Sequence, residues 1–346
     1  MCGTMENMTA IESLHTHTTL SDGKLSHREL FDLAESLGVA VLAFTDHDAL
    51  PPPAVMNELE ALRERATKWV IGIEVTSNLP KELLPISTSV HIIGLFVDPT
   101  NEALREHCHR AQGARVRRMK GIVENLQKLG FRITEEDCLE MSGGESVGRP
   151  HVVQALEKYS ENNVVMDSLR REMAKEAEGN PEVQKRYVRM IEKGERQYPY
   201  TLFLSADAYR NGYVEHDYMP DFDEAVALIR NAGGVAVIAH YGTIRSKMSL
   251  DMLDKLLTEK RIDGAEVVYG MREYGTTEEK TLVAEQVAIR AMTQKHGALA
   301  LGGSDAHTRE ELEYYAAQDW FSGETAGFTG RILETGRVSK KFSSLL

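Results

Sequence analysis

The chain of 346 residues contains few cysteines, no long apolar run and no excess of positive charge. Its three cysteines, Cys2, Cys108 and Cys138, are scattered without a CxxC pair, which is typical of a reducing compartment, so we expect a cytoplasmic location. No apolar run approaches the roughly 20 residues that cross a membrane, and the opening MCGTMENMTA lacks the basic flank and apolar stretch of a signal peptide. The net charge of −13 argues against a long nucleic acid as partner, because that needs a basic footprint.

Apolar segments of strand length alternate with helical patterns along the first hundred residues. Residues 11–17 and 39–44 have the composition of strands, and between them Ser26 and Glu29 form a capping box for a helix that stops at Gly38. Three prolines at 51–53 then precede a helix that we expect to reach about Thr67, followed by a strand over 69–76. Strand and helix in alternation predict a parallel sheet that is covered by helices.

The segment after Ser77 breaks this alternation. It carries two prolines and no helical stripe, whereas a parallel crossover needs about a dozen or more residues and usually a helix. We therefore predict that 69–76 and 90–97 pair antiparallel.

The alternation resumes at Asp221, which reads as a second helix cap, and strands are predicted at 235–240, 262–269 and 298–304. Seven strands over this length favour an α/β fold, a distorted seven-stranded (β/α)7 barrel. The intervening residues look helical, and His107 and Cys108 are expected on a helix surface. The predicted organisation is a barrel over 9–100 and 221–312, an inserted helical cap over 101–220 and a C-terminal extension over 313–346.

Ionisable side chains gather where the predicted strands end. His15 and His17 share one face of a strand, because residues i and i+2 point the same way, and Asp22 follows in a turn. His47 lies in the sequence TDHD directly after a buried strand, and Glu74 lies inside an apolar one, where a carboxylate must be paired or coordinate a metal. A lone strand histidine is more often an ordinary core residue, but here the pattern recurs. The nine candidate ligands are His15, His17, Asp22, His47, Glu74, His91, His240, Asp305 and His307.

These nine residues fall at one end of successive strands, where barrel enzymes place their sites. We therefore predict a multinuclear metal centre. Mixed histidine and carboxylate ligands suit Mn, Fe or Zn, with Mg possible in principle.

The segments LHTHTTLSDGKLS, LAFTDHDAL, GIEVT, VHIIGLF, GGVAVIAH and GGSDAHT resemble, in order, the motifs of the PHP family of metal-dependent phosphoesterases. The resemblance covers about 9–100 and 221–310 and is strongest to the branch of AMP phosphatases and 3′,5′-nucleoside bisphosphate phosphatases, which also carries a helical insert. One departure is Tyr241, where the family usually has proline.

The resemblance implies two to three divalent ions. One would be held by His15, His17, Glu74 and Asp305, a second by Glu74, His91 and His240, and a third by Asp22, His47 and His307. Three carboxylates against three divalent ions leave a positive surplus that attracts phosphate, and paired metals activate a bridging water. Glu74, Asp305, His307 and Arg149 are the expected catalytic residues.

The expected reaction is hydrolysis of a phosphomonoester by a metal-bound hydroxide, on a small phosphorylated substrate such as AMP or a nucleoside 3′,5′-bisphosphate. The alternatives are a 5′–3′ exonuclease on short RNA, a histidinol-phosphatase-like sugar or alcohol phosphatase, and a catalytically silent scaffold. The oligomeric state is left open.

Arg149 and His151 form an RxH motif that resembles the family and starts a predicted helix, where anions are favoured. We predict that both bind substrate. A basic cluster on the long helix, at Arg115, Arg117, Arg118 and Lys120, is either a solvated face or a nucleotide contact.

Overall fold

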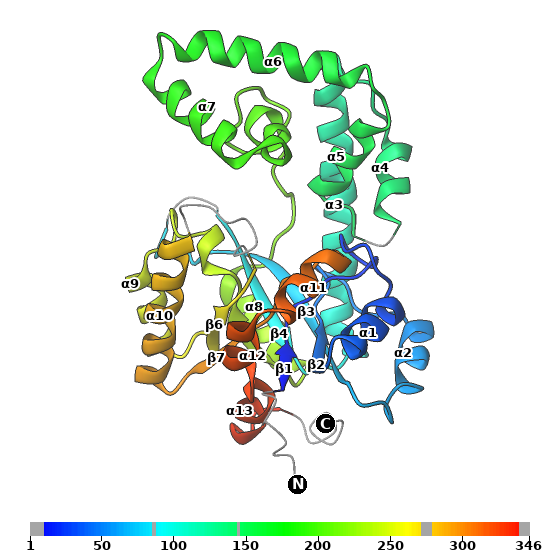
Figure 1. Ribbon diagram of the computed structural model, residues 1–346, viewed down its shortest axis with the longest axis vertical. Helices are drawn as coiled ribbons and strands as arrows, with labels where there is room; N and C mark the ends of the chain where they lie inside the picture. Colours follow the sequence, from blue (N-terminus) through cyan, green and yellow to red (C-terminus); the bar gives the residue numbers. More distant parts are fainter. Residues whose placement is uncertain (1–9, 85–87, 144–145, 271–278, 339–346) are drawn as a thin grey trace, which may run out of the picture. The chain divides into compact units, whose positions relative to one another are not determined.

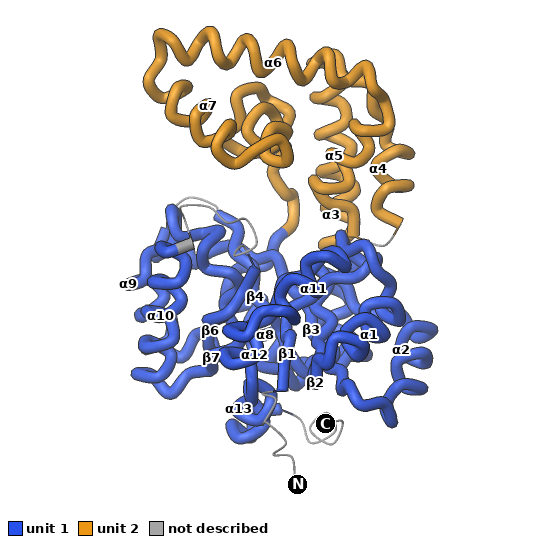
Figure 2. Tube along the Cα trace, in the orientation of Figure 1, with its two compact units in different colours: residues 1–109, 219–346 blue, residues 110–218 orange. Residues whose placement is uncertain are grey.

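The computed structural model describes residues 10–84, 88–143, 146–270 and 279–338, and so leaves out Cys2, Gly144 and the last eight residues of the predicted C-terminal extension. The chain divides into two compact units, residues 1–109 with 219–346 and residues 110–218 (Figure 2). In the described ranges, no helix combines the length and the apolar composition needed to cross a bilayer.

Unit 1 is built on one seven-stranded sheet whose strands lie in chain order, which confirms the α/β class. Figure 1 shows these strands with helices around them. The strands are β1 (Ile11–Ser13), β2 (Val39–Phe44), β3 (Lys68–Asn78), β4 (Ser89–Leu95), β5 (Val235–Ile238), β6 (Gly264–Val268) and β7 (Leu299–Gly302).

The sheet closes on itself just beyond β1 and β7. Leu14 N donates to Gly302 O at 3.1 Å, Asp305 N to His15 O at 2.9 Å, and His17 N to Ala306 O at 3.0 Å. These bonds join the segment after β1 to the segment after β7, so the seven strands form a barrel. The closure brings His15 and His17 beside Asp305.

The strand β4 runs antiparallel to both neighbours, β3 and β5, while the other pairs are parallel. The predicted antiparallel pairing is therefore confirmed, with Thr76 opposite His91 and Glu74 opposite Ile93. Because of this direction, His91 at the start of β4 lies beside the carboxyl half of β3. A parallel β4 would have carried it to the other end of the barrel.

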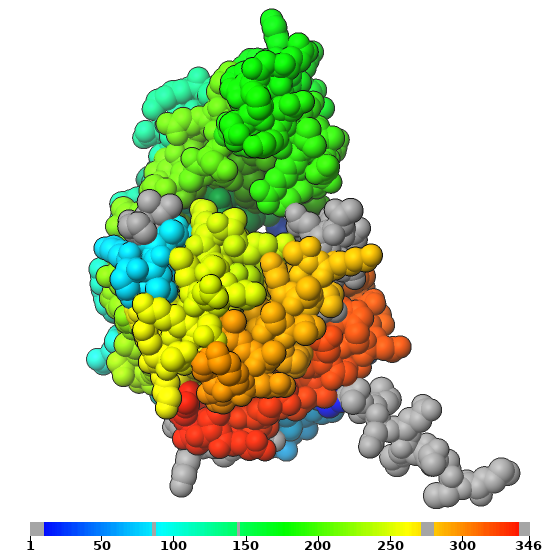
Figure 3. Space-filling model, turned by 90° about the vertical axis from the view of Figure 1, so that its left-hand side faces the viewer, coloured from blue at the N-terminus to red at the C-terminus, as the bar shows by residue number. Residues whose placement is uncertain are grey.

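Helices flank the barrel strands in unit 1. They are α1 (His27–Ser36), α2 (Pro53–Glu60), the start of α3 (Glu102–Lys128), α8 (Phe222–Asn231), α9 (Leu250–Thr258), α10 (Glu279–His296), α11 (Arg309–Ala316), α12 (Asp319–Thr325) and α13 (Phe328–Glu334). Figure 3 shows one side of this unit, whose surface is formed mainly by the part of the chain that contains α9, α10 and the C-terminal helices. The C-terminal helices are tied to β1 because Glu12, which is buried, accepts hydrogen bonds from Gly327 N at 2.9 Å and Thr329 N at 2.6 Å.

Two local expectations were wrong, and a third was confirmed. The helix after the prolines ends at Glu60 rather than near Thr67, whose hydroxyl instead donates to Val39 O at 2.7 Å. The helix cap expected at Asp221 is confirmed in position, because Asp221 is the N-cap residue of α8, although its side chain makes no capping hydrogen bond. His107 and Cys108 are buried rather than on the surface, because the first turns of α3 pack against the barrel, with His107 Nε2 3.3 Å from Asp48 Oδ1.

Unit 2 is helical. It contains the rest of α3 with α4 (Glu135–Ser142), α5 (Arg149–Glu157), α6 (Asn162–Ala177), α7 (Pro181–Lys193) and a π-helical turn (Tyr200–Leu204). It has its own apolar core, in which Phe131 and Phe203 lie with ring centroids 4.8 Å apart.

Candidate metal centre

The nine predicted ligands all lie in unit 1, and the structure brings them together around Glu74 of β3. Glu74 Oε1 lies 2.8 Å from His91 Nδ1 and 2.8 Å from His240 Nε2. Glu74 Oε2 lies 2.9 Å from His47 Nδ1, and His17 Nε2 and His15 Nε2 follow at 3.3 and 3.6 Å. One fully buried carboxylate therefore faces five imidazoles.

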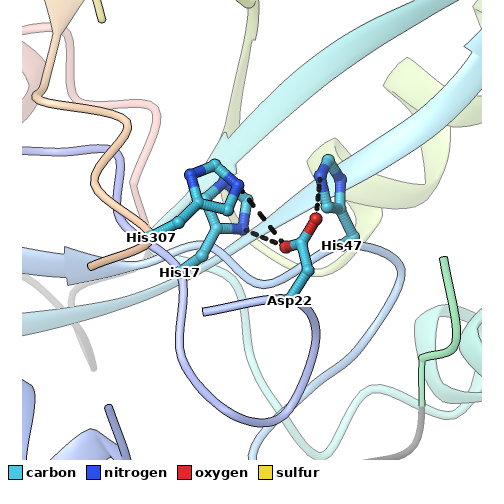
Figure 4. A group of neighbouring side chains, drawn as sticks. All are labelled: His17, Asp22, His47 and His307. Atoms are coloured by element: carbon cyan, nitrogen blue, oxygen red, sulfur yellow. Dashed lines mark ion pairs between the residues drawn. The ribbon is translucent and has the colours of Figure 1, made fainter. Parts of the chain in front are cut away.

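Asp305 and Asp22 extend this cluster on either side. Asp305 Oδ1 lies 3.2 Å from both His15 Nε2 and His17 Nε2. Asp22 sits among His17, His47 and His307, at 3.5 to 3.7 Å from one ring nitrogen of each, as Figure 4 shows. The side chains fall into three groups whose ligand atoms lie within 4.8 Å of one another: His17, Asp22, His47 and His307; His15, His17 and Asp305; and His47, Glu74 and His91.

This partition differs in detail from the one that the family resemblance implies. His17 and His47 each face two groups, with a different ring nitrogen toward each, and His240 contacts Glu74 without joining a group.

The cluster fits divalent metals better than it fits hydrogen bonds. Within the described part of the chain, Glu74 Oε2 is buried and accepts no hydrogen bond, although three imidazole nitrogens approach it. A buried carboxylate oxygen without a donor is costly, whereas a cation bound by the same atoms would satisfy it. Imidazole and carboxylate together are the donor set of Mn, Fe and Zn sites.

The pKa values of the cluster are shifted by the close contacts between its carboxylates and its histidines. Burial alone would raise the pKa of Glu74, but His47, His91 and His15 outweigh it and hold the pKa well below its ordinary value. For His307 burial lowers the pKa, but Asp22, Asp305 and Glu311 raise it to about 9. The raised pKa of His307 favours a proton on this ring when no metal is bound there.

In the TDHD sequence after β2, His47 is a ligand candidate. Asp46 and Asp48 are clamps, buried carboxylates that fix neighbouring segments through hydrogen bonds. The backbone of His47 forms an isolated parallel β-bridge with the backbone of Glu74 on β3. Asp46 accepts hydrogen bonds from Thr18 N at 2.8 Å and Ser21 Oγ at 2.6 Å, and so holds the loop that carries Asp22. Asp48 accepts from Thr76 N and Thr76 Oγ1 at 2.9 and 2.8 Å.

Backbone strain is located at two of the candidate ligands. His240 has φ +21° and Asp305 has φ +54°, both uncommon for residues with a side chain. Tyr241, which replaces the usual proline, is buried, and its hydroxyl donates to Met248 O at 2.6 Å, so it anchors the loop after β5.

The carboxylate of Glu266 also belongs to the cluster, although the sequence patterns did not single it out. Glu266 lies in β6, is almost fully buried, and has one oxygen 2.9 Å from His15 Nδ1. The signal was available, because Glu266 is a carboxylate inside an apolar strand, as Glu74 is.

Arg149 and His151 lie in unit 2, at the start of α5. His151 is buried and its Nδ1 accepts a hydrogen bond from Gly148 N at 2.9 Å, which closes the first turn of the helix. Arg149 Nη1 donates to Leu204 O at 3.2 Å, and its guanidinium lies 5.7 Å from the Tyr200 ring centroid.

The basic residues of α3 differ in their surroundings, because some form ion pairs at the surface and one is buried. Arg117 pairs with Asp217 at 2.5 Å and Lys120 with Glu135 at 2.7 Å, both at the surface. Arg118 is buried and donates to Val214 O at 2.6 Å, and its pKa is lowered to about 10 by burial and by the positive charges of Arg149 and Arg115. Like charges held this close favour an anion.

The histidines and carboxylates gather at one end of the barrel, where barrel enzymes place their sites, and they are of the types that bind metal ions. Residues 13–266, most of the chain, match the family model described as PHP domain, and the chain belongs to the PHP family. It is therefore a metal-dependent phosphoesterase, a hydrolase whose clusters of histidine, aspartate and glutamate can bind metal ions.

Individual relatives agree with this class. The chain is 25% identical over 304 residues to the 5′-3′ exoribonuclease Rnm of Escherichia coli strain K12, covering 87% of this chain and 86% of that protein. It is also 25% identical over 302 residues to the 3′,5′-nucleoside bisphosphate phosphatase of Chromobacterium violaceum, covering 86% and 87%. Among solved structures, a metal-dependent phosphoesterase from Bifidobacterium adolescentis superposes with a TM-score of 0.61 at 26% identity, covering 87% of this chain and 89% of the other.

Proposed function

We propose that the chain hydrolyses a phosphomonoester of a nucleotide, either AMP or a nucleoside 3′,5′-bisphosphate, and releases inorganic phosphate. The observation that carries the proposal is the crowding of nine ligand candidates around Glu74, with both of its oxygens facing imidazoles. The relative named as a 3′,5′-nucleoside bisphosphate phosphatase supports the substrate class.

In this proposal the nine residues hold two to three divalent ions, with Glu74 shared between neighbouring positions. Ions bound there act as Lewis acids on phosphoryl oxygens and lower the pKa of a water. Glu74, Asp305 and His307 are the proposed catalytic residues of the barrel. The chain's own part is to hold these groups in place, through the buried clamps Asp46 and Asp48 and the closed seam between β1 and β7.

For recognition of the nucleotide we propose Arg149, with His151 shaping the start of its helix. Among the residues described, Arg149 donates to Leu204 O and lies over the Tyr200 ring but pairs with no carboxylate, and its positive charge, together with that of Arg115, lowers the pKa of Arg118. A guanidinium suits a phosphate oxygen, because its planar fork matches that geometry.

The second candidate function is 5′–3′ exonuclease activity on short RNA, which the similarity to the E. coli exoribonuclease favours at equal identity. The two functions differ in their products. A phosphomonoesterase releases inorganic phosphate, whereas an exonuclease releases mononucleotides that keep theirs.

The test uses purified protein of known metal content with added Mn²⁺ and four substrates: AMP, a nucleoside 3′,5′-bisphosphate, a 5′-phosphorylated trinucleotide and histidinol phosphate. We expect phosphate release from AMP or the bisphosphate with the highest kcat/KM of the panel. Mononucleotide release from the trinucleotide as the dominant reaction would replace the proposal with the exonuclease. Dominant turnover of histidinol phosphate would replace it with the sugar or alcohol phosphatase.

A further inference from the structure

Glu266 touches two of the candidate metal ligands at once, through its two carboxylate oxygens. Oε1 lies 2.9 Å from His15 Nδ1, and Oε2 accepts a hydrogen bond from the backbone N–H of His240 at 2.7 Å. All three residues are buried, and they come from different parts of the barrel wall: the segment after β1, the strand β6 and the end of β5.

The first contact selects a tautomer of His15. A hydrogen bond from the His15 ring to this carboxylate oxygen places the ring proton on Nδ1. The lone pair of Nε2 then points at the centre of the cluster, where His17 Nε2 lies at 3.1 Å and Asp305 Oδ1 at 3.2 Å. That is the orientation that a metal ligand needs.

The second contact holds a strained residue. The backbone of His240 has φ +21° and ψ 64°, a conformation that persists only where the surroundings enforce it. The hydrogen bond from His240 N to Glu266 fixes this turn, and with it the direction of the ring, whose Nε2 lies 2.8 Å from Glu74 Oε1.

We propose that Glu266 is a positioning residue that sets the tautomer of His15 and the backbone of His240, and so couples two positions of the metal centre. It acts through these histidines and contacts no substrate. The inference rests on the metal-dependent class of the enzyme and not on the proposed nucleotide substrate.

Glu266→Gln tests this with little change of shape. Glutamine has one acceptor oxygen where glutamate has two, and here two donors face the group. Its NH₂ must therefore face either His15 Nδ1, which forces the other tautomer, or His240 N–H, which loses its acceptor. In either case one candidate ligand, His15 or His240, loses the hydrogen bond that holds it in position.

Glu12→Gln is the matched control. Glu12 is, like Glu266, a buried barrel glutamate with a hydrogen-bond partner on each oxygen. Its partners are Gly327 N and Thr329 N, so these bonds hold the C-terminal helices. Its loss should lower stability without touching the metal centre.

Equilibrium dialysis against a Mn²⁺ series, with metal quantified in the protein, measures binding without depending on turnover. We expect Glu266→Gln to bind at least one ion roughly 10–100-fold more weakly than wild type, the usual effect of losing such a partner, and Glu12→Gln to bind as wild type does. Unchanged affinity in Glu266→Gln would overturn the proposal, and so would an equal loss in both variants.

A measurement on the wild type decides the case even if Glu266→Gln does not fold. In the Zn²⁺-loaded protein, long-range ¹H–¹⁵N correlation spectra report which ring nitrogen of each histidine carries the proton. We expect His15 to be protonated on Nδ1. A proton on His15 Nε2 would overturn the proposal. Because neither experiment uses a nucleotide, a failure of the nucleotide proposal remains separate from a failure of this one.

Discussion

Glu74 lies at the centre of the candidate site, because its two oxygens face five histidine nitrogens in a fully buried position. Its charge is what would let two cations sit near one another without strong repulsion. The surrounding imidazoles hold the pKa of Glu74 well below its ordinary value despite burial, so it stays ionised.

Glu74→Gln removes that charge and keeps the shape of the side chain. We expect kcat to fall on the order of 10³-fold or more, the scale of losing metal-activated chemistry, and to fall further than in Arg149→Ala. The measurement is kcat at saturating Mn²⁺ with bound metal quantified in the same samples. A near-normal kcat would mean that Glu74 does not bridge metal positions.

Arg149 carries a separate prediction at this scale. Arg149→Ala should lower kcat/KM for a nucleotide by roughly 10–100-fold, the effect of losing one charge-assisted contact. A small aryl phosphate should be less affected, because it lacks the remote part of the substrate that Arg149 is proposed to hold.

Arg132→Ala is the matched control for Arg149→Ala. Arg132 also belongs to unit 2 and lies over a tyrosine ring, at 4.1 Å from Tyr159, but it is paired with Glu161 at the surface. We expect near-normal kinetics for it. Equal losses on both substrates in Arg149→Ala would place Arg149 at the scissile phosphate instead, and no loss on either would make it structural.

At the scale of elements, the sequence predicted the seven strands, the capping box of α1 and the antiparallel β4. These features follow from local patterns: an apolar period, a cap at fixed spacing, and a loop too irregular for a crossover helix. The predicted end of α2 was wrong because no local sequence signal marks the true end. Residues beyond Glu60 are held by tertiary hydrogen bonds such as that from the Thr67 hydroxyl to Val39 O.

The convergence of the nine ligand candidates could be predicted because strand ends meet at one edge of a barrel. The partners of the supporting residues could not be predicted, since they are distant in sequence. Glu266 is 251 residues from His15 and Asp46 is 28 from Thr18, and only the closed fold shows which carboxylate faces a cluster and which holds a loop.

The seam between β1 and β7 carries a prediction at the same scale. Gly303 lies so close to the segment after β1 that an added Cβ would be 2.3 Å from His15 N and 2.9 Å from Leu14 N. Gly303→Ala must push the two segments apart, and we expect a loss of about 1–3 kcal/mol in the free energy of unfolding, as for other overpacked sites, with weaker Mn²⁺ binding.

Gly330→Ala provides the control for the seam. Gly330 lies in α13, and an added Cβ there meets nothing within 4 Å, so the substitution should be neutral or slightly stabilising. Urea unfolding and metal titration of both variants make the comparison. If Gly303→Ala were as stable as Gly330→Ala, the close seam would not constrain the site.

At the scale of the whole molecule, the chemistry and the proposed recognition belong to different units. All nine ligand candidates and Glu266 come from residues 1–109 and 219–346, and Arg149 with its basic neighbours comes from residues 110–218. Each unit has its own apolar core. Metal binding should therefore stabilise unit 1 directly, because ions bind the folded cluster and not the unfolded chain.

The response of stability to pH should depend on whether metal is bound. In the metal-free protein the pKa of His307 is raised to about 9 by Asp22, Asp305 and Glu311 against the effect of burial, and the pKa of His15 is also raised. A histidine with a raised pKa stabilises the folded state fully below its ordinary pKa, near 6.5, and this contribution is lost as pH rises through the raised value. Between pH 6.5 and 9 the folded metal-free chain binds more protons than the unfolded chain, so its stability should fall.

His17 does not reverse this trend, since burial and the neighbouring His307 lower its pKa to about 4, and its contribution changes only below pH 6.5. With saturating Mn²⁺ the metal takes the place of these protons and binds more tightly as pH rises. We therefore expect the difference in Tm between metal-loaded and chelated protein to widen from pH 6.5 to 9, as measured by thermal unfolding at constant ionic strength.

His307→Asn should reduce the slope of Tm against pH in the chelated protein, which separates this effect from the general repulsion of a chain with net charge −13. A chelated protein whose Tm rises across this range, or a slope that His307→Asn leaves unchanged, would show that the cluster does not hold protons in place of metal.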